Sequence, residues 1–261
     1  MRGSIIAFGG KGGVGKTTTA AMVLHRLIAD GVKPILAVDA DPNATLALTL
    51  GIEGAETIAD LRDRMGQAAQ EPSEISKTRL MDQWLAELLS EHVGFDLITM
   101  GRPEGRKCYC YINGLLRRYL SLLRNNYACV LVDCEAGMEY LSRLVIDDVE
   151  SLILVAEPTP IGLTTVQRMS ELADSLDLNV KRRILVVNKI GIPGVPVPDL
   201  NDASGIHGID RVVQVPFDTD LATRCGQGEP VDSQAGDSSV KPIADIAALA
   251  LGRPAPSAGP E

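Results

Sequence analysis

The sequence lacks an excess of basic residues. Over 261 residues it has 34 Asp and Glu against 25 Lys and Arg, which gives a formal net charge of −9. A general nucleic-acid-binding surface needs clustered Lys and Arg to neutralise phosphates. We therefore expect no nucleic-acid partner of that kind.

Long apolar runs are missing as well. No apolar stretch approaches the roughly 20 residues that cross a membrane, and no charged start, apolar core and cleavage site form a signal peptide. We expect a cytoplasmic protein with no membrane partner. The five cysteines are an odd number, which argues against a disulfide framework and for thiols kept reduced for another use.

A glycine-rich stretch follows the first apolar run. Residues 10–18 read Gly-Lys-Gly-Gly-Val-Gly-Lys-Thr-Thr, the pattern of a phosphate loop. Glycines let backbone N–H groups converge on phosphate oxygens, and the following helix adds its positive end. We predict an ATP or GTP site in which Lys16 reaches the β and γ phosphates and the Thr17 hydroxyl holds Mg²⁺; a glycine-rich turn without a ligand is the alternative. The predicted nucleotide-binding residues of the loop are Gly12, Gly13, Val14, Gly15, Lys16, Thr17 and Thr18.

Apolar runs alternate with helical repeats along most of the chain. Expected strands cover residues 4–8, 34–38, 95–100, 129–132, 152–156, 184–187 and 211–215. Expected helices cover residues 16–30, 44–50, 57–65, 78–92, 111–125, 160–176 and 240–251. The alternation predicts an α/β fold, a single-domain P-loop NTPase with a mostly parallel central sheet and helices on both faces. The domain is expected to span residues 1–252, with a loop at 192–208 and a disordered tail at 253–261.

Acidic residues follow two of these strands, at the edge of the sheet where the phosphate loop lies. Asp39 and Asp41 come after the second strand, and Asp133 follows the apolar run 129–132, as in a Walker B motif. An aspartate there can hold a magnesium-bound water. Gly137, just beyond, suits a loop that senses the γ phosphate. For the Asp39 and Asp41 pair, the alternative is an Asp-Pro turn that caps the next helix.

Lys11 lies within the phosphate loop, where the general pattern accepts any residue. Residues 11–18 resemble the deviant Walker A motif of dimeric ATPases such as nitrogenase iron protein, ParA and MinD. The resemblance implies a homodimer in which Lys11 crosses to the partner's ATP and stabilises charge during phosphoryl transfer. It also implies that Asp41 positions the attacking water and that Asp39 lies close to magnesium. A solvated loop lysine is the alternative for Lys11.

The same resemblance assigns the base of the nucleotide to two strand ends. In this family an Asn-Lys pair at the end of a strand meets the adenine edge, and Asn188 with Lys189 stands at that place. Pro216, Phe217 and Asp218 follow the next strand and are expected to complete the base pocket. The alternative for Asn188 is a polar residue that merely ends a strand.

Cys108 and Cys110 lie on a loop at the same edge of the expected sheet. Two thiols cannot fill a tetrahedral site, which needs four ligands, but a twofold axis would bring one Cys-x-Cys from each chain together. Thiolates favour zinc, copper(I), iron–sulfur clusters, or nickel where the geometry can flatten. We predict a metal site at the dimer interface, with two unconnected cysteines as the alternative.

Three segments point to a narrower family. Gly-Arg-Pro-Glu-Gly at 101–105, Cys-Tyr-Cys-Tyr at 108–111 and Glu-Ala-Gly-Met-Glu at 135–139 are similar to the nickel-insertion ATPases that mature carbon monoxide dehydrogenase. The resemblance implies Ni²⁺ or Zn²⁺ on Cys108 and Cys110 between two subunits, and carbon monoxide dehydrogenase as the client enzyme. Cys134 and Tyr140 depart from the family pattern. Cys134 is either a further thiol near the interface or a small apolar filler.

Three other functions stay open on the sequence. An acetyl-CoA synthase maturation factor is a close relative with a similar pattern. A reductase of the nitrogenase iron protein type would hold an iron–sulfur cluster on the same four thiols, although such reductases take their cysteines from two separate segments. A partition ATPase would act on DNA or a membrane, but the acidic balance and the missing basic amphipathic helix near the C-terminus argue against it.

Overall fold

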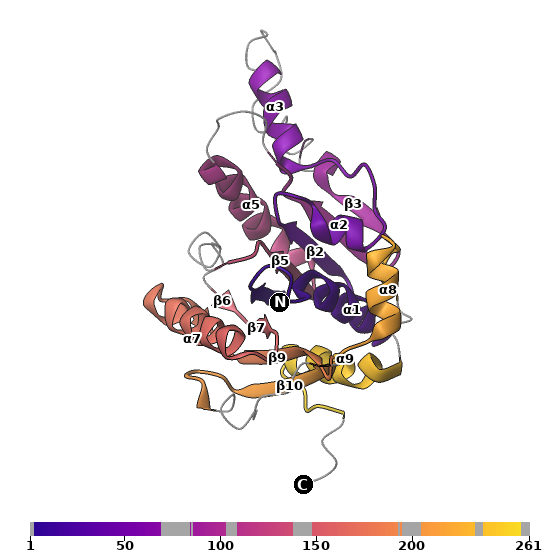
Figure 1. Ribbon diagram of the computed structural model, residues 1–261. Helices are drawn as coiled ribbons and strands as arrows, with labels where there is room; N and C mark the ends of the chain where they lie inside the picture. The colour runs from indigo at the N-terminus through magenta and orange to yellow at the C-terminus, as the bar shows by residue number, and fades with distance from the viewer. Residues whose placement is uncertain are drawn as a thin grey trace.

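An eight-stranded sheet runs through the middle of the molecule (Figure 1). The computed structural model describes residues 3–68, 84, 86–102, 109–137, 148–192, 194, 205–232 and 237–256. Within these, the strand order is β10-β9-β7-β1-β5-β2-β4-β3, parallel throughout except between β3 and β4. The strands are β1 (Ser4–Gly10), β2 (Ile35–Ala40), β3 (Ser90–His92), β4 (Phe95–Thr99), β5 (Cys129–Cys134), β7 (Ser151–Ala156), β9 (Arg183–Ile190) and β10 (Arg211–Pro216). Two short strands, β6 (Asp148–Val149) and β8 (Asn179–Val180), form a separate parallel pair.

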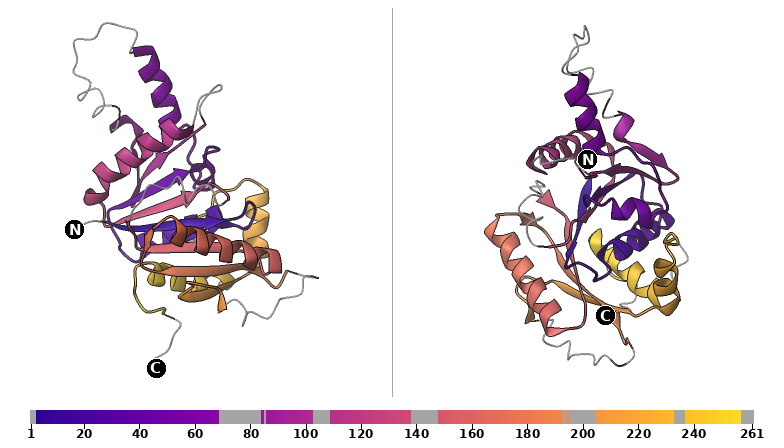
Figure 2. Two further views of the ribbon diagram at one scale, coloured as in Figure 1. Left: turned by 90° about the vertical axis from the view of Figure 1, so that its left-hand side faces the viewer. Right: turned by 45° about the horizontal axis from the view of Figure 1, so that its top comes forward.

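Helices cover both faces of this sheet (Figure 2). One face packs against α1 (Lys16–Ala29), α2 (Thr45–Thr49), α8 (Thr219–Gly226) and α9 (Asp237–Ala250). The other packs against α3 (Ile58–Ala68), α5 (Tyr109–Leu123) and α7 (Pro160–Ser175), and the 3-10 turn η1 (Arg124–Asn126) follows α5.

Alternation along β1 shows why the strands read as unbroken apolar runs. Ile5 and Ala7 belong to the core beneath α5 and α7, whereas Ile6 and Phe8 belong to the core beneath α1 and α9. Successive side chains of a strand point to opposite faces, so a strand covered on both sides must be apolar at every position. This confirms the predicted α/β fold with a mostly parallel sheet and helices on both faces.

The sheet brings the acidic residues to the phosphate loop. β5 lies between β1 and β2, and Asp133 on β5 is paired in register with Asp39 on β2 and with Phe8 on β1. Because parallel strands end at the same edge, the loop after β1 and the aspartates of β2 and β5 meet there.

Two sequence predictions about the elements were wrong. Residues 84 and 86–88 are helical, but the helix predicted over 78–92 does not reach its expected end, because Ser90–His92 turns through Gly94 and pairs antiparallel with β4. Helix α8 was not predicted at all, since its eight residues are too few for a clear apolar repeat. Residues 78–83 and 85, most of the loop at 192–208 and the last five residues of the predicted tail lie outside the described residues. No helix in the described part of the chain is long and apolar enough to cross a membrane.

Candidate nucleotide site

The phosphate loop joins β1 to α1 and is closely packed from two sides. A Cβ atom at Gly10 would lie 2.5 Å from the Val155 carbonyl oxygen, and one at Gly15 would lie 2.4 Å from Nδ2 of Asn188. Gly15 also has φ +90°, a left-handed conformation that costs glycine little. The Gly137 N–H donates to the Gly10 carbonyl at 3.2 Å, so the loop after β5 touches the phosphate loop directly.

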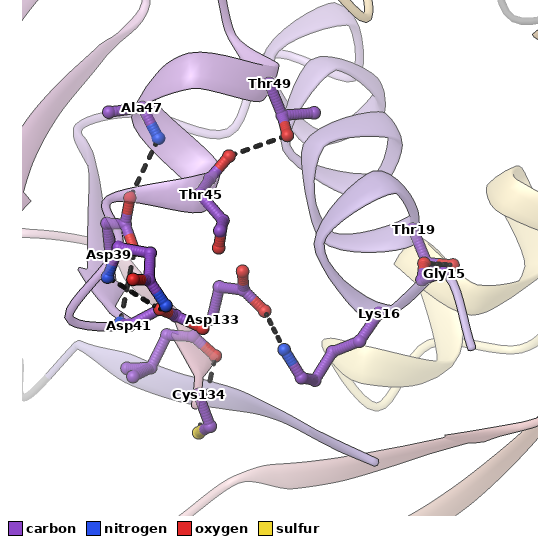
Figure 3. A network of polar contacts seen from close by, with 12 residues as sticks. Gly15, Lys16, Thr19, Asp39, Asp41, Thr45, Ala47, Thr49, Asp133 and Cys134 are labelled. Carbon is purple, nitrogen blue, oxygen red and sulfur yellow. Dashed lines mark hydrogen bonds and ion pairs between the residues drawn. The ribbon is translucent and has the colours of Figure 1, made fainter. Parts of the chain in front are cut away.

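Lys16 and Asp133 form a buried pair at the centre of this edge (Figure 3). The Lys16 Nζ lies 3.3 Å from Asp133 Oδ1, and both side chains are buried. Burial raises the pKa of Asp133, while Lys16 and the Thr17 hydroxyl oppose that rise. Asp133 Oδ2 has no hydrogen-bond partner among the described residues, although it is buried.

These groups fit a hydrated magnesium ion. The Thr17 hydroxyl lies at the start of α1, and Asp133 Oδ2 is a buried oxygen atom without a hydrogen-bond partner among the described residues. Magnesium usually keeps part of its water shell, and oxygen atoms of this kind can bind the ion or its waters. The ion would supply positive charge to the phosphates, and Lys16, Thr17 and Asp133 would hold it or its waters. The role of each residue stays a prediction.

Asp39 organises the backbone around it. Its Oδ2 accepts from the Ala47 N–H of α2 at 2.9 Å and its Oδ1 from the Asp41 N–H at 3.2 Å, and its side chain is fully buried. Burial raises the pKa of Asp39 to about 7; the neighbouring Asp133 adds to the rise, while the Ala47 N–H opposes it. Both oxygens thus hold the turn after β2 and the first turn of α2, as in the turn-and-cap alternative given for this pair. The predicted nearness of Asp39 to magnesium stays a prediction.

We expect Asp39→Asn to flatten the pH dependence of stability in the absence of nucleotide. The folded pKa near 7 exceeds the ordinary 3.8, so between these values the folded chain keeps a proton that the unfolded chain has lost. The contribution of Asp39 to the free energy of unfolding is therefore fully present below about pH 4. It falls as the pH rises toward 7, by up to about 1.4 kcal/mol per pH unit for one proton. Urea unfolding of both proteins at pH 5.5 and 7.0 measures this. An equal loss of stability in the variant would contradict the prediction.

Asp41 is fixed by its own turn. Its Oδ1 accepts from the Asn43 backbone N–H at 2.8 Å and from Asn43 Nδ2 at 3.0 Å, and only 8% of the residue is exposed. The Asp-Pro turn offered as the alternative in the sequence is therefore present. It coexists with the predicted role of Asp41 in water positioning, because the turn holds the carboxylate at the same sheet edge as Lys16 and Asp133 (Figure 3).

Asn188 and Lys189 bind the phosphate loop from the end of β9. The Asn188 Nδ2 donates to the Val14 carbonyl at 2.8 Å, and its Oδ1 accepts from the Lys189 N–H at 2.9 Å. Lys189 has φ +62° and donates from Nζ both to the Gly13 carbonyl and to Glu157 Oε1, each at 2.7 Å. In this arrangement Asn188 braces the loop, and its predicted contact with adenine remains a prediction.

A hollow of about 210 Å³ opens beside the phosphate loop. It contains the predicted Gly13, Gly15, Thr18, Asn188, Pro216 and Phe217 in its lining. Sequence reasoning missed Met22 of α1 and a wall made by α8, namely Leu221, Ala222 and Cys225. The available signal was Asp218, whose carboxylate caps α8 by accepting from the Leu221 N–H at 3.0 Å, since Asp before a helix is a common cap.

Lys11, the first lysine of the phosphate loop, has different surroundings from Lys16. It is exposed and lines a second hollow of about 250 Å³, formed with Glu157 and Thr159 at the end of β7 and with Ile161 and Val166 of α7. The two lysines of the loop therefore differ: Lys16 is buried and paired with Asp133, whereas Lys11 is exposed and lines the hollow at α7.

The cysteines fall into two groups. Cys108 lies outside the described residues, and Cys110 is in the first turn of α5, where its side chain is not described. Cys129 and Cys134 are buried in β5; burial raises the pKa of Cys129 to about 12 and that of Cys134 well above the ordinary value. Cys134 packs into the apolar core on the side of α5 and α7, as the apolar-filler alternative predicts. Elsewhere in the described chain, no group of three or more His, Cys, Asp or Glu is arranged to hold a metal.

Comparisons with known proteins agree with a nucleotide-binding site at this place. Residues 3–186 match the family AAA_31, described as an AAA domain. An uncharacterized ATP-binding protein of Methanocaldococcus jannaschii is 34% identical over 230 residues, covering 87% of this chain and 90% of that protein. The carbon monoxide dehydrogenase accessory protein CooC of Rhodospirillum rubrum is 32% identical over 226 residues, covering 82% of this chain and 84% of that protein.

Solved structures share the fold. MinD of Aquifex aeolicus superposes with a TM-score of 0.70 at 24% identity, over 97% of this chain and 98% of that chain. MinD of Pyrococcus horikoshii in complex with Mg-ADP gives a TM-score of 0.64 at 20% identity, over 96% of this chain and 98% of that chain.

The phosphate loop, the buried Lys16–Asp133 pair and the parallel sheet define a P-loop ATPase. The chain belongs to the AAA_31 family, for which ATP and Mg²⁺ are typical ligands, and it has the fold of the MinD structures.

Proposed function

We propose that this ATPase is a nickel metallochaperone, which works as a homodimer and inserts nickel into carbon monoxide dehydrogenase. The observation that carries the proposal is the 32% identity with the carbon monoxide dehydrogenase accessory protein CooC over 82% of this chain, together with the Cys-x-Cys at Cys108 and Cys110. Nickel is the cargo, held by one such pair from each chain.

Two features of the described chain support a dimer. Lys11 is exposed, and it lines the hollow at α7. A lysine in that position is free to reach the ATP of a partner across a twofold axis.

The course of the chain supports a link between nucleotide and metal. The Met100 N–H, just after β4, donates to the Asp39 carbonyl at 2.8 Å, and the Met100 carbonyl accepts from the Ala59 N–H at 3.1 Å. From there the chain leads to Cys108 and into α5, whose end connects through η1 to β5 and Asp133. The cysteine segment thus follows Met100, whose N–H is hydrogen-bonded to the Asp39 carbonyl, so a movement of Asp39 can reach the segment through this bond.

These residues have the following roles in the proposed mechanism. Lys16 and the loop N–H groups bind the phosphates, Asp41 orients water for hydrolysis, and Lys11 of each chain stabilises charge at the partner's ATP. ATP favours the closed dimer, in which four thiolates meet and capture nickel, and hydrolysis opens the dimer and releases it. Because only the closed dimer binds both ligands well, ATP and nickel must raise each other's affinity by the same factor.

Equilibrium dialysis of the full chain with Ni²⁺, with and without a non-hydrolysable ATP analogue, tests the proposal. We expect about one nickel per two chains, bound about tenfold more tightly with the analogue, within the usual range of coupling. Absence of nickel binding in both states would overturn it. An iron–sulfur absorption band in anaerobically purified protein would instead favour a reductase of the nitrogenase iron protein type.

A further inference from the structure

Two buried oxygen atoms near the phosphate loop have no hydrogen-bond partner among the described residues. Thr45 is the first residue of α2, and its Oγ1 is buried with no hydrogen-bond partner among the described residues. Asp133 Oδ2, on β5, is also buried without a hydrogen-bond partner among the described residues. Figure 3 shows the Thr45 side chain pointing toward the Asp133 carboxylate, on the side away from Cys134.

The backbone holds Thr45 in this place. Ala44, the residue before it, has φ +55° and turns the chain into α2, whose Ala47 N–H is held by the buried Asp39. The Thr49 hydroxyl donates to the Thr45 carbonyl at 2.7 Å, so the carbonyl is engaged while the hydroxyl is not. The turn thus fixes the backbone of Thr45 beside β5, and its hydroxyl points toward Asp133 (Figure 3).

The energetics argue for a ligand between the two groups. A buried polar group left without a partner costs about 1–3 kcal/mol, and a valine would occupy the place of Thr45 without that cost. On the other side, Lys16 is bound to Asp133 Oδ1 only, which leaves Oδ2 turned toward Thr45. A polar species that contacts both oxygens would satisfy both at once.

We propose that Thr45 is a positioning residue of the magnesium site, its hydroxyl and Asp133 Oδ2 together holding water of the ion's hydration shell. Magnesium keeps several of its waters when bound by protein, and these need oxygen partners. The proposal adds a residue of α2 to Thr17 and Asp133. It depends on the ATPase site and not on nickel delivery.

The test compares Thr45→Val with Thr45→Ser and with Thr49→Val, a matched loss of a hydroxyl from the same helix. ADP affinity is measured by titration calorimetry with Mg²⁺ and with EDTA, and thermal unfolding is measured without nucleotide. In Thr45→Val we expect the tightening of ADP binding by Mg²⁺ to fall about three- to tenfold, as one hydrogen bond would give. We expect Thr45→Ser and Thr49→Val to keep the wild-type tightening of ADP binding by Mg²⁺.

Unfolding separates this role from a structural one. Since the hydroxyl has no partner in the free protein, Thr45→Val should unfold at the same or a higher temperature than the wild type. A lowered unfolding temperature with an unchanged Mg²⁺ effect would overturn the proposal, as would an unchanged Mg²⁺ effect in a stable variant. If Thr45→Val does not fold, Thr45→Ala is judged by the same Mg²⁺ effect.

Discussion

Lys11→Gln is expected to lower the turnover number for ATP hydrolysis about a thousandfold while ATP affinity stays within a few-fold of wild type. Lys16 provides the buried cation of the chain's own site, whereas Lys11 is exposed and lies against α7. Loss of Lys11 should therefore spare phosphate binding and remove only a charge supplied during phosphoryl transfer. Steady-state hydrolysis and analogue binding measure the two effects separately.

A suitable control is Lys181→Gln. Lys181 is also an exposed lysine, paired with Glu150 at 2.9 Å, and its side chain is 59% exposed. It adjoins β8, at the opposite ends of the strands from the phosphate loop, so turnover should not change. Normal turnover in Lys11→Gln would show that Lys11 is only a solvated loop residue, and the proposed dimeric ATPase mechanism would lose its main support.

Asp41→Asn is expected to lower turnover by about 10²- to 10⁴-fold, the range for loss of a group that positions or deprotonates water. The asparagine keeps the shape of the side chain, and its oxygen can still accept from the Asn43 N–H, which lies 2.8 Å from Asp41 Oδ1. It cannot take a proton. Turnover within threefold of wild type would reduce Asp41 to the turn-forming residue that its contacts with Asn43 already show.

Mixing the two inactive variants distinguishes action within a chain from action across the dimer. If Lys11 acts in trans and Asp41 in its own chain, a mixed dimer has one intact site, built from the Asp41 of one chain and the Lys11 of the other. About half of randomly formed dimers are mixed, and each mixed dimer has one working site of its two. Activity should therefore return to roughly a quarter of wild type. No recovery would mean that both residues serve the same chain's site.

The sequence was most informative where local pattern and burial coincide. The phosphate loop and the apolar strands were predictable because a fixed spacing of glycines and a strand buried on both faces leave few alternatives. The positions of the three aspartates were also predictable, since each lies at or just beyond the end of a strand at the same edge.

What could not be predicted depends on contacts between distant segments. Asp39 and Ala47 meet through a turn that requires Ala44 in a left-handed conformation, which no pattern signals. The wall of the base pocket from α8 and the hairpin at Ser90–His92 are set by packing and strand pairing. A dimer site built from one Cys-x-Cys per chain cannot be read from one chain except by resemblance.

The most direct test of the account is nickel dialysis of the wild type beside Cys108→Ser, in the presence of a non-hydrolysable ATP analogue. Cys108 is a predicted metal ligand and is not among the residues predicted to bind the nucleotide, so we expect the variant to lose one ligand and to keep ATP binding. The account predicts about one nickel per two wild-type chains, none for the variant, and equal binding of the analogue by both. Equal nickel binding by the two proteins would contradict it.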